Sequence, residues 1–339
     1  MIEESRHQRI ADLATEAAQM LQDQLIRTPL VEIPAELLPA GPDRLFLKLE
    51  CHQVSGSFKA RGATHFIERL LRDAAVAGEP LPAGVLTYSS GNHGRAVSEV
   101  AAAHGLPALV VAPETIDAVK AKAVTAAGAE LVRVGPTTDE RKERAEQIAA
   151  ERGWTMIPPF DHDWIMAGQG TLLLEVLEDL ELLEVLGGLD HLWVPVGGGG
   201  LSGGCAAVAA AEAADCQVHT VEPIGSASLA QSLAAGQHLR LEQTASEADG
   251  LLPLTVGDRN WQVLSALKVV PEVISERQLI QSLKILHHKV EIAAEPSGAC
   301  AAAPILAANP EEPLPGGIHV AVVSGGNVSA ERLARLLCS

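Results

Sequence analysis

The regular alternation of short apolar runs with amphipathic stretches is the feature that most constrains how this chain folds. Between residues 84 and 157, strands are predicted at 85–88, 108–112, 130–134 and 154–157, and helices between them at 93–104, 115–127 and 138–151. Gly105 and Gly128 each follow a predicted helix, at a position suited to a left-handed helix end. Strands separated by helices of this length need right-handed crossovers, so they form a parallel sheet.

A second set of alternating predicted strands and helices lies before and after this region in the sequence. Its predicted strands lie at 45–49, 191–196, 217–222 and 319–323, and its helices at 5–26, 168–185, 201–213, 276–289 and 297–307. The stretch 235–260 is less regular. We therefore expect an α/β protein with two lobes, in which mostly parallel sheets carry helices on both faces and a cleft separates the lobes.

Composition narrows the class of protein. The chain has 339 residues, of which 47% are hydrophobic and 20% charged, which excludes wholesale disorder. A formal charge of −18 argues against nucleic acid or an anionic membrane as the main partner. The five cysteines are scattered, so we predict free thiols and no zinc site. The acidic first residues and the lack of a long apolar run make the cytoplasm the expected location.

Two short segments could carry chemistry near the first half of the chain. Residues 55–62 read SGSFKARG, and a lysine among small residues can lose solvent, which lowers its pKa and makes it a nucleophile toward an aldehyde. Taken alone, Lys59 is more often a surface charge. Residues 89–94 read SSGNHG between a strand and a helix, where exposed amides attract an anion such as a carboxylate. Such turns also serve merely as helix caps.

Two further segments follow strands of the second series. Residues 194–204 read VPVGGGGLSGG, and a run of glycines before a helix can fold its amides around a phosphate. Gly198, Gly200 and Gly203 also satisfy the dinucleotide-binding spacing, with Glu222 at the end of the next strand, so a dinucleotide-dependent oxidoreductase stays an alternative at this point. Residues 324–327 read SGGN after an apolar strand, where Ser324 points into the crevice that binds ligands in α/β proteins.

The four segments in this order resemble the fold-type II family of enzymes that use pyridoxal 5′-phosphate (PLP), a tryptophan synthase β-like fold, and within it the branch of threonine/serine dehydratases and serine racemases. The resemblance runs from about residue 28 to 330 and includes the segments 158–162, 167–171, 248–250 and 295–299. It implies a large PLP-binding domain of residues 1–53 and 160–339, a helix at 54–83 that bridges the cleft, and a small mobile domain at 84–159.

The resemblance also implies a role for individual residues. Lys59 would carry PLP as a Schiff base, with Phe58 beside the ring, Asn92 on the ring hydroxyl and Ser324 facing the pyridine nitrogen. The phosphate would be clasped by the amides of Gly197, Gly198, Gly199, Gly200 and Leu201. The substrate carboxylate would be gripped by the turn of Ser89, Ser90, Gly91, Asn92 and His93.

The expected activity is an ammonia-lyase (dehydratase) that converts L-threonine or L-serine to a 2-oxo acid and ammonia. A hydroxyl at Ser324 stabilises a protonated pyridine less than a carboxylate would, so the ring is a weaker electron sink and early loss of a β-leaving group is favoured. A serine racemase stays an alternative because of Ser90. Racemisation needs at least two acid/base groups flanking one carbon, and Ser90 could be the second such group beside Lys59. Dehydratases of 3-hydroxyaspartate or phenylserine, and a non-catalytic PLP carrier, are further alternatives.

Two expectations concern partners other than the hydroxy-amino acid. Relatives that hold a divalent cation (Mg²⁺ or Ca²⁺) near the phosphate loop use a Glu, a carbonyl and an Asp. Glu222 matches the Glu, whereas Ser228 stands in place of the Asp. Relatives are commonly dimers or tetramers, so a homo-oligomer is expected.

Overall fold

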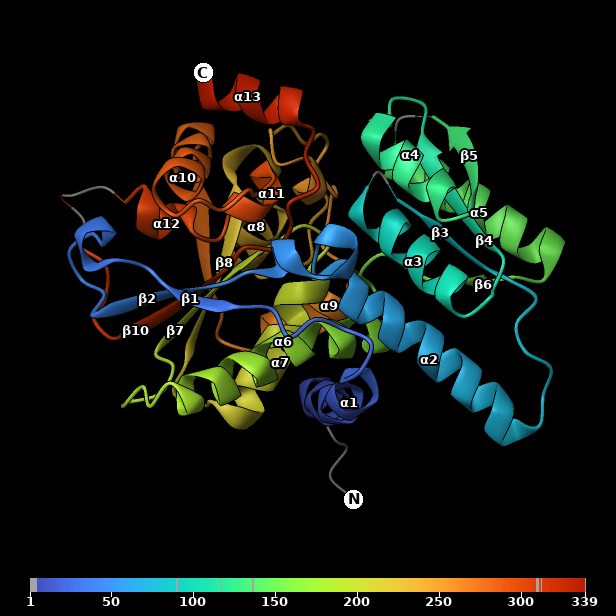
Figure 1. Ribbon diagram of the computed structural model, residues 1–339, viewed down its shortest axis with the longest axis horizontal. Coiled ribbons are helices and arrows are strands. Elements are labelled where there is room, and N and C mark those ends of the chain that lie inside the picture. The colour runs from blue at the N-terminus through green and yellow to red at the C-terminus, as the bar shows by residue number, and fades with distance from the viewer. Residues whose placement is uncertain are drawn as a thin grey trace.

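The strands of the computed structural model form two separate sheets, within the part that it describes: residues 5–89, 91–116, 118–135, 137–308, 311 and 313–338. The larger sheet has the order β1-β2-β10-β7-β8-β9, with bounds Leu30–Glu32, Arg44–Lys48, Ile318–Val322, His191–Pro195, Gln217–Pro223 and Val270–Ile274 (Figure 1). All its neighbouring strands are parallel except β1 and β2. The last strand of the chain thus lies in the middle of this sheet.

The smaller sheet has the order β5-β4-β3-β6, with bounds Glu130–Val134, Ala108–Pro113, Val85–Tyr88 and Thr155–Met156, and all its pairs are parallel. Its connections are helices α3 (Asn92–Ala103), α4 (Ala118–Ala126) and α5 (Thr138–Arg152). Strands β3 and β4 are buried along their whole length, because helices cover both faces, and this explains their continuous apolar sequences. Thr137 and Glu140 form a capping box that begins α5, and Gly153 ends it in the left-handed conformation.

The larger sheet separates two hydrophobic layers (Figure 1). One face is covered by α1 (Arg6–Leu21), α6 (Asp163–Leu182), α7 (Gly200–Glu212) and α9 (Asp258–Ala266), and the other by α10 (Glu276–Lys289), α11 (Pro296–Ala299), α12 (Ala303–Leu306) and α13 (Ala330–Cys338). Neighbouring strand residues alternate between the layers: Trp193 packs in the second and Val194 in the first. Helix α8 (Ser228–Ala235) follows β8.

Helix α2 (Lys59–Ala77) connects the two sheets (Figure 1). It begins at the junction between them, and its first two turns are buried against α6 and α3. It then runs outward and ends at Gly78, whose left-handed backbone bonds back to the last turn. The N-terminal end of α2 is therefore the part of this helix that the rest of the protein holds most firmly.

The two mostly parallel sheets confirm the predicted fold class. The predicted strands of the smaller sheet are found within a residue or two, as are four of the eight helices predicted from the pattern. The helices predicted at 5–26, 115–127 and 168–185 differ by three to five residues at one end or both, and 297–307 holds two short helices, α11 and α12. Four elements were not predicted: β1, β9, α8 and α9, three of which border the less regular stretch. The boundaries proposed for the domains, at residues 53, 83 and 159, remain predictions.

None of the helices in the described ranges has both the length and the apolar character that crossing a membrane would need. The five cysteines are free thiols, as predicted.

Candidate active site

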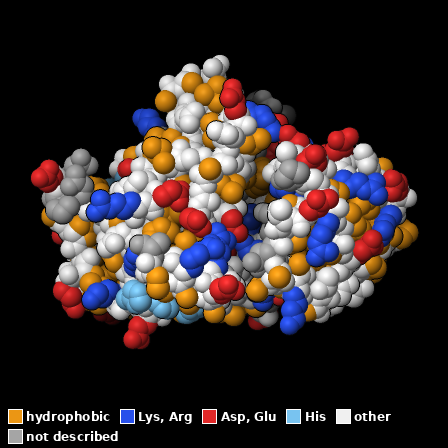
Figure 2. Space-filling view, turned by 90° about the horizontal axis from the view of Figure 1, so that it is seen from above, with side chains coloured by type: hydrophobic (Ala, Val, Ile, Leu, Met, Phe, Trp, Pro, Cys, Tyr) orange, Lys and Arg blue, Asp and Glu red, His pale blue; other side chains and the backbone are white. Residues whose placement is uncertain are grey.

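A cavity of about 650 Å³ lies where the two sheets meet. Loops that follow β3, β7 and β10 line it, together with the beginning of α2 and segments around residues 137–141, 159–160 and 242–254. Figure 2 shows a hollow between the two parts of the molecule, with Lys and Arg side chains at its edge. This is the crevice at the carboxyl ends of parallel strands in which α/β proteins bind ligands.

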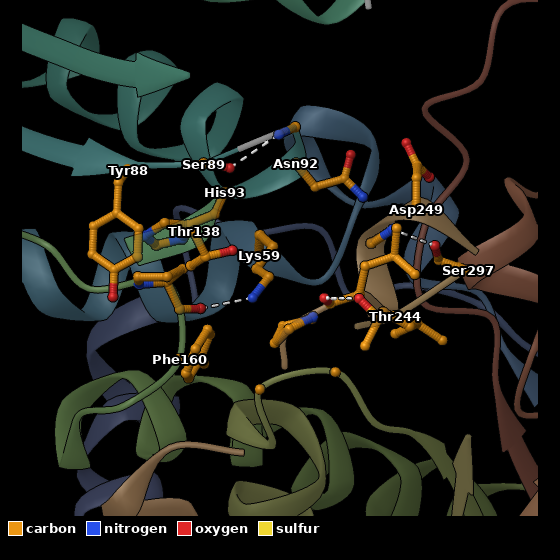
Figure 3. Close-up of a pocket in the computed structure, with 18 of the residues that line it drawn as sticks. Lys59, Tyr88, Ser89, Asn92, His93, Thr138, Phe160, Thr244, Asp249 and Ser297 are labelled. Atoms are coloured by element: carbon orange, nitrogen blue, oxygen red, sulfur yellow. Dashed lines mark hydrogen bonds between the residues drawn. The ribbon is translucent and has the colours of Figure 1, made fainter. Parts of the chain in front are cut away.

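Lys59 is the first residue of α2, and its side chain points into the cavity (Figure 3). Its Nζ donates a hydrogen bond of 2.7 Å to the carbonyl of Pro159 and lies 4.9 Å from the centre of the Phe58 ring. Burial lowers the pKa of the Lys59 amine to about 8. A much larger fraction of this amine is therefore uncharged near neutral pH than of an ordinary lysine, which is the form that attacks an aldehyde.

Backbone hydrogen bonds join the lysine segment to the segment after β10. The amide of Phe58 donates to the carbonyl of Ser324 over 3.1 Å, and Ser57 forms a β-bridge with Gly325. Ser55, just before this bridge, has a left-handed backbone with φ of 61°. Lys59 and Ser324 are thus placed together by main-chain geometry, although strands β3 to β10 all lie between them in the sequence.

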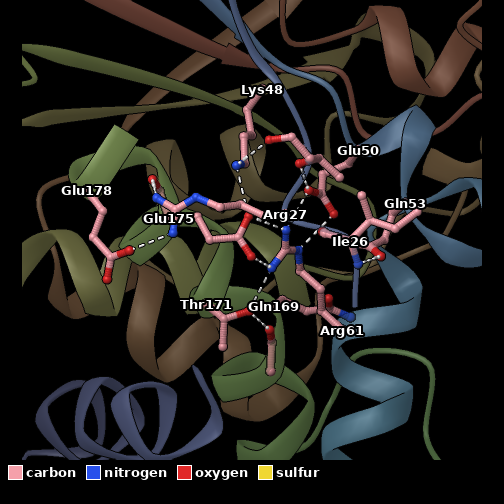
Figure 4. Close-up of polar contacts among 12 residues, drawn as sticks. Ile26, Arg27, Lys48, Glu50, Gln53, Arg61, Gln169, Thr171, Glu175 and Glu178 are labelled. Carbon is pink, nitrogen blue, oxygen red and sulfur yellow. Dashed lines mark hydrogen bonds and ion pairs between the residues drawn. The ribbon is translucent and has the colours of Figure 1, made fainter. Parts of the chain in front are cut away.

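A buried network of charged side chains holds α2 close to its N-terminal end (Figure 4). The Arg61 guanidinium donates to both oxygens of Glu50, at 2.8 Å each, and to both oxygens of Glu175, at 2.7 and 2.8 Å. Arg61, Glu50 and Lys48 have side chains that are 0% exposed, and Lys48 also pairs with Glu175. Since β2, α2 and α6 each contribute, this network fixes where the helix that carries Lys59 begins.

The predicted glycine loop ends β7 and begins α7. Gly199 is left-handed, with φ of 86°, and Gly203 bonds to its carbonyl in the first turn of the helix. The Gly198 carbonyl accepts hydrogen bonds from the Gly257 amide and from the Asn260 side chain. The first amides of a 13-residue helix therefore lie open toward the cavity, where they attract an anion.

We predict that Gly198→Ala weakens cofactor binding. A Cβ at Gly198 would lie 2.2 Å from the Phe160 ring, so the loop or the ring must move. Such overpacking costs roughly 1–3 kcal/mol, and we expect the PLP dissociation constant to rise about tenfold or more. Titration of the PLP-free protein with PLP measures this. Gly316→Ala is the matched control, since the nearest atom to its Cβ lies 3.7 Å away; equal effects of the two variants would contradict the prediction.

The predicted substrate turn begins α3. The Gly91 amide donates to the hydroxyl of Ser89 over 3.0 Å, and Asn92 and His93 both line the cavity. His93 is buried, which lowers its pKa to about 3 and keeps the ring neutral. Ser90 lies outside the described residues, so its role as a second acid/base group remains a prediction.

Ser324 and the segment before α11 form the other wall. The hydroxyl of Ser324 is buried and donates to the carbonyl of Ser297 over 3.3 Å, while the Ser297 hydroxyl accepts from the Gly250 amide. The cavity therefore presents a neutral hydroxyl at this position.

Glu222 does not fit a cation site. Its carboxylate is buried at the end of β8 and accepts hydrogen bonds from the amides of Leu229 and Ala230, at the start of the unpredicted helix α8. Burial raises its pKa to about 7. Nowhere in the described ranges do three or more His, Cys, Asp or Glu side chains come together in a way that could hold a metal ion. The amides of α8 thus occupy the oxygens that were expected to bind the cation.

Several cavity residues were not assigned a role from the sequence. Lys120 of α4 reaches across the cavity to Asp249 over 2.5 Å, and Arg332 of α13 contacts the same carboxylate at 3.3 Å. Glu295 is buried, which raises its pKa to about 7, and Arg141 of α5 lines the smaller-sheet side. Asp249 and Glu295 lie in the segments 248–250 and 295–299 of the family resemblance, but nothing in the local sequence around Lys120, Arg141 or Arg332 indicates a role, because each meets its partners only after folding.

The described residues fit PLP. A desolvated lysine amine stands at one side of the cavity, and at the other a glycine loop has positions where a Cβ would meet Phe160. The amides of α7 suit a phosphate, and Asn92 and Ser324 offer neutral polar groups between the two. A nucleophilic lysine and a phosphate cradle in one crevice of an α/β fold define the class of PLP-dependent enzymes.

Comparison with known proteins agrees with this class. Residues 21–325 match the family described as "Pyridoxal-phosphate dependent enzyme". The chain therefore belongs to the fold-type II PLP-dependent enzymes, in the branch of threonine/serine dehydratases and serine racemases. This assignment makes the dinucleotide alternative wrong.

The relatives have different activities. The L-threo-3-hydroxyaspartate ammonia-lyase of Saccharomyces cerevisiae is 32% identical over 87% of this chain and 86% of its own length. The serine racemase of Arabidopsis thaliana is 34% identical, with 96% of each chain covered. The processed form of threonine deaminase isoform 2 from Solanum lycopersicum superposes with a TM-score of 0.84 at 28% identity, covering 97% of this chain and 87% of that one.

Proposed function

We propose that this protein is a PLP-dependent ammonia-lyase that removes water and then ammonia from a β-hydroxy amino acid, with L-threonine or L-serine as substrate. The observation that carries the proposal is the pairing, in one cavity, of the Lys59 amine with a neutral hydroxyl at Ser324. PLP supplies, when bound, an electron sink for bonds at the α-carbon of an amino acid. A hydroxyl partner makes that sink weaker, which favours loss of a β-substituent over a long-lived carbanion.

Different residues of the chain bind the cofactor, bind the substrate carboxylate and accept the α-proton. The amides of the α7 N-terminus hold the phosphate, and Asn92 holds the cofactor from the side of the smaller sheet. The N-terminus of α3, with Ser89 and Gly91, binds the substrate carboxylate. The Lys59 amine, whose pKa of about 8 lies close to neutral pH, accepts the α-proton at Nζ.

The test is a panel of D- and L-β-hydroxy amino acids supplied to the PLP-loaded protein. We expect stoichiometric 2-oxo acid and ammonia from L-threonine or L-serine. Interconversion of serine enantiomers without ammonia release would show a racemase instead, with Ser90 as the second acid/base group. Absence of both reactions across the panel would leave a PLP-binding protein without catalysis and would overturn the proposal.

One observation favours 3-hydroxyaspartate as a second candidate substrate. Arg141 lines the cavity beside Thr137 and Thr138, and its Nη2 donates to the Thr138 hydroxyl over 2.9 Å. Burial lowers the pKa of the Arg141 guanidinium, although it remains charged at neutral pH. A second carboxylate on the substrate would meet this cation, and a relative is named for this activity.

We predict that Arg141→Met changes substrate preference. A hydrogen-bonded charge contact of this kind contributes enough that kcat/KM for 3-hydroxyaspartate should fall roughly tenfold to a hundredfold, while that for serine changes little. Competition between the two substrates measures the ratio directly. Lys142→Met, an exposed neighbour, is the control. An unchanged ratio in Arg141→Met would remove the support for an acidic substrate.

A further inference from the structure

A hydrogen-bond network of four side chains, Arg95, Asn327, Asn92 and Glu295, runs from the outer side of α3 into the cavity. Nη1 of Arg95 donates to Oδ1 of Asn327 over 2.7 Å, and Nδ2 of Asn327 donates to Oδ1 of Asn92 over 2.9 Å. Nδ2 of Asn92 then donates to Oε1 of Glu295. Arg95 is one-third exposed, whereas Glu295 is buried and lines the cavity.

The network has a fixed direction because its outer member can only donate. An amide side chain can turn over and exchange its oxygen for its nitrogen, but a guanidinium has no acceptor. Asn327 must therefore present its oxygen to Arg95. Its nitrogen then faces inward, where it also meets the Ser55 carbonyl at 2.8 Å, a group that can only accept. Two independent partners thus set the orientation of Asn327.

The orientation of Asn327 sets that of Asn92 in turn. Oδ1 of Asn92 accepts from Asn327, so Nδ2 of Asn92 lies on the side of Glu295. The backbone of Gly325 packs against both groups: a Cβ there would lie 2.5 Å from Oε1 of Glu295 and 3.2 Å from Nδ2 of Asn92. Of the two Asn92 amide hydrogens, Glu295 takes one, and among the described contacts the other stays available to a ligand in the cavity.

We propose that Arg95 and Asn327 are positioning residues for the cofactor, which act by holding the Asn92 amide with its nitrogen, and not its oxygen, toward the group bound beside Lys59. Neither residue needs to touch the cofactor. The inference rests on the PLP site of the proposed function and extends it to the outer surface of α3.

The proposal has a spectroscopic consequence. A hydrogen bond donated to the charged form of an acid lowers its pKa, and loss of that donor raises it. When the Asn92 nitrogen faces the cofactor it stabilises a negatively charged ring oxygen. If the amide turns over, the oxygen of Asn92 faces the ring instead, and the midpoint of the pH-dependent visible absorbance of bound PLP moves upward.

The experiment uses the PLP-loaded protein and the variants Asn327→Asp and Arg95→Met. Asn327→Asp places an acceptor where the network needs a donor, so we expect the absorbance midpoint to rise by about one pH unit and the PLP dissociation constant to rise roughly tenfold. Arg95→Met removes only the outer donor, and the Ser55 carbonyl still orients Asn327. Its shift should have the same sign and be smaller. Arg95→Lys, which restores a donor, should return the midpoint toward that of the unaltered protein.

Glu99→Gln is the matched control. Glu99 accepts from Nε of Arg95 over 2.7 Å but does not belong to the network. Glu99→Gln removes one negative charge beside Arg95 and breaks an ion pair within α3. The shift of its absorbance midpoint therefore measures the effects of charge and helix stability without an effect of the network. Asn327→Asp also adds a negative charge, whose effect on the midpoint is screened by salt. Repeating the titrations at high salt therefore separates the effect of this charge from the effect of a reversed Asn92 amide.

The possible outcomes test the positioning role of Arg95 and Asn327 separately from the proposed ammonia-lyase activity. An unchanged midpoint in Asn327→Asp, or shifts of equal size and opposite sign in Glu99→Gln and Arg95→Met, overturns the positioning role while leaving the activity intact. The expected shifts in a protein that releases no ammonia from any hydroxy amino acid support the positioning role and overturn only the function. Failure of the unaltered protein to bind PLP at Lys59 overturns both.

Discussion

Lys59→Ala is expected to abolish turnover and the visible absorbance of lysine-bound PLP together. The Lys59 amine stands in the cavity with a pKa lowered to about 8, and the proposed mechanism uses it both to bind the cofactor and to accept the α-proton. Loss of a positioned base alone lowers rates by about 10²–10⁴-fold. Ammonia release and an absorbance spectrum of the dialysed protein measure the two effects.

The control for this variant is Lys122→Ala, at an exposed position of α4. It removes the same charge from the same part of the molecule and should leave both measurements unchanged. Lys59→Arg is a further comparison, because it keeps the charge and removes the uncharged amine. Near-normal turnover in either Lys59 variant would contradict the assignment of this residue.

The second large effect is on stability. Arg61→Met should lower the free energy of unfolding by about 3–5 kcal/mol, because it leaves the buried Glu50 carboxylate and the half-buried Glu175 carboxylate without their main partner. Glu50 and Arg61 are both fully buried, so water cannot replace the lost hydrogen bonds. Denaturant titration followed by circular dichroism measures the change.

Arg72→Met, on the exposed side of the same helix, is the matched control and should stay within about 0.5 kcal/mol of the unaltered protein. Because the Arg61 network also fixes the start of α2, we expect Arg61→Met to weaken PLP binding under conditions where it remains folded. A loss of stability below about 1 kcal/mol would mean that the network contributes little to the fold.

Local motifs explain why much of the site could be predicted from the sequence. Lys59 is the first residue of a helix, the glycine loop joins a strand to a helix, and Ser324 follows a strand, so each motif occupies a few neighbouring residues at the end of an element. The strand and helix alternation likewise predicted the smaller sheet and four of the six strands of the larger one. Each of these motifs alone allowed more than one interpretation, and only their order along the chain, which the sequence contains, pointed to PLP.

The remaining features depend on distant segments. Asn92 and Asn327 bond across 235 positions of sequence, and Arg61 meets Glu175 across 114. Glu222 was predicted as a metal ligand because it matches the Glu of relatives that hold a cation. The amides that donate to its carboxylate belong to α8, a short helix that the sequence analysis did not predict. Tertiary contacts therefore decided the roles of charged side chains that sequence patterns left open.

The position of β10 has a consequence for how the protein is made. This strand lies between β2 and β7, and the segment that follows it bonds to the backbone beside Lys59. During synthesis, β2 and β7 leave the ribosome long before β10, so the central part of the larger sheet cannot form until β10 has emerged. Lys59 cannot reach its final surroundings until β10 and the segment after it have emerged, so the cofactor can be captured only after every strand of both sheets has been synthesised.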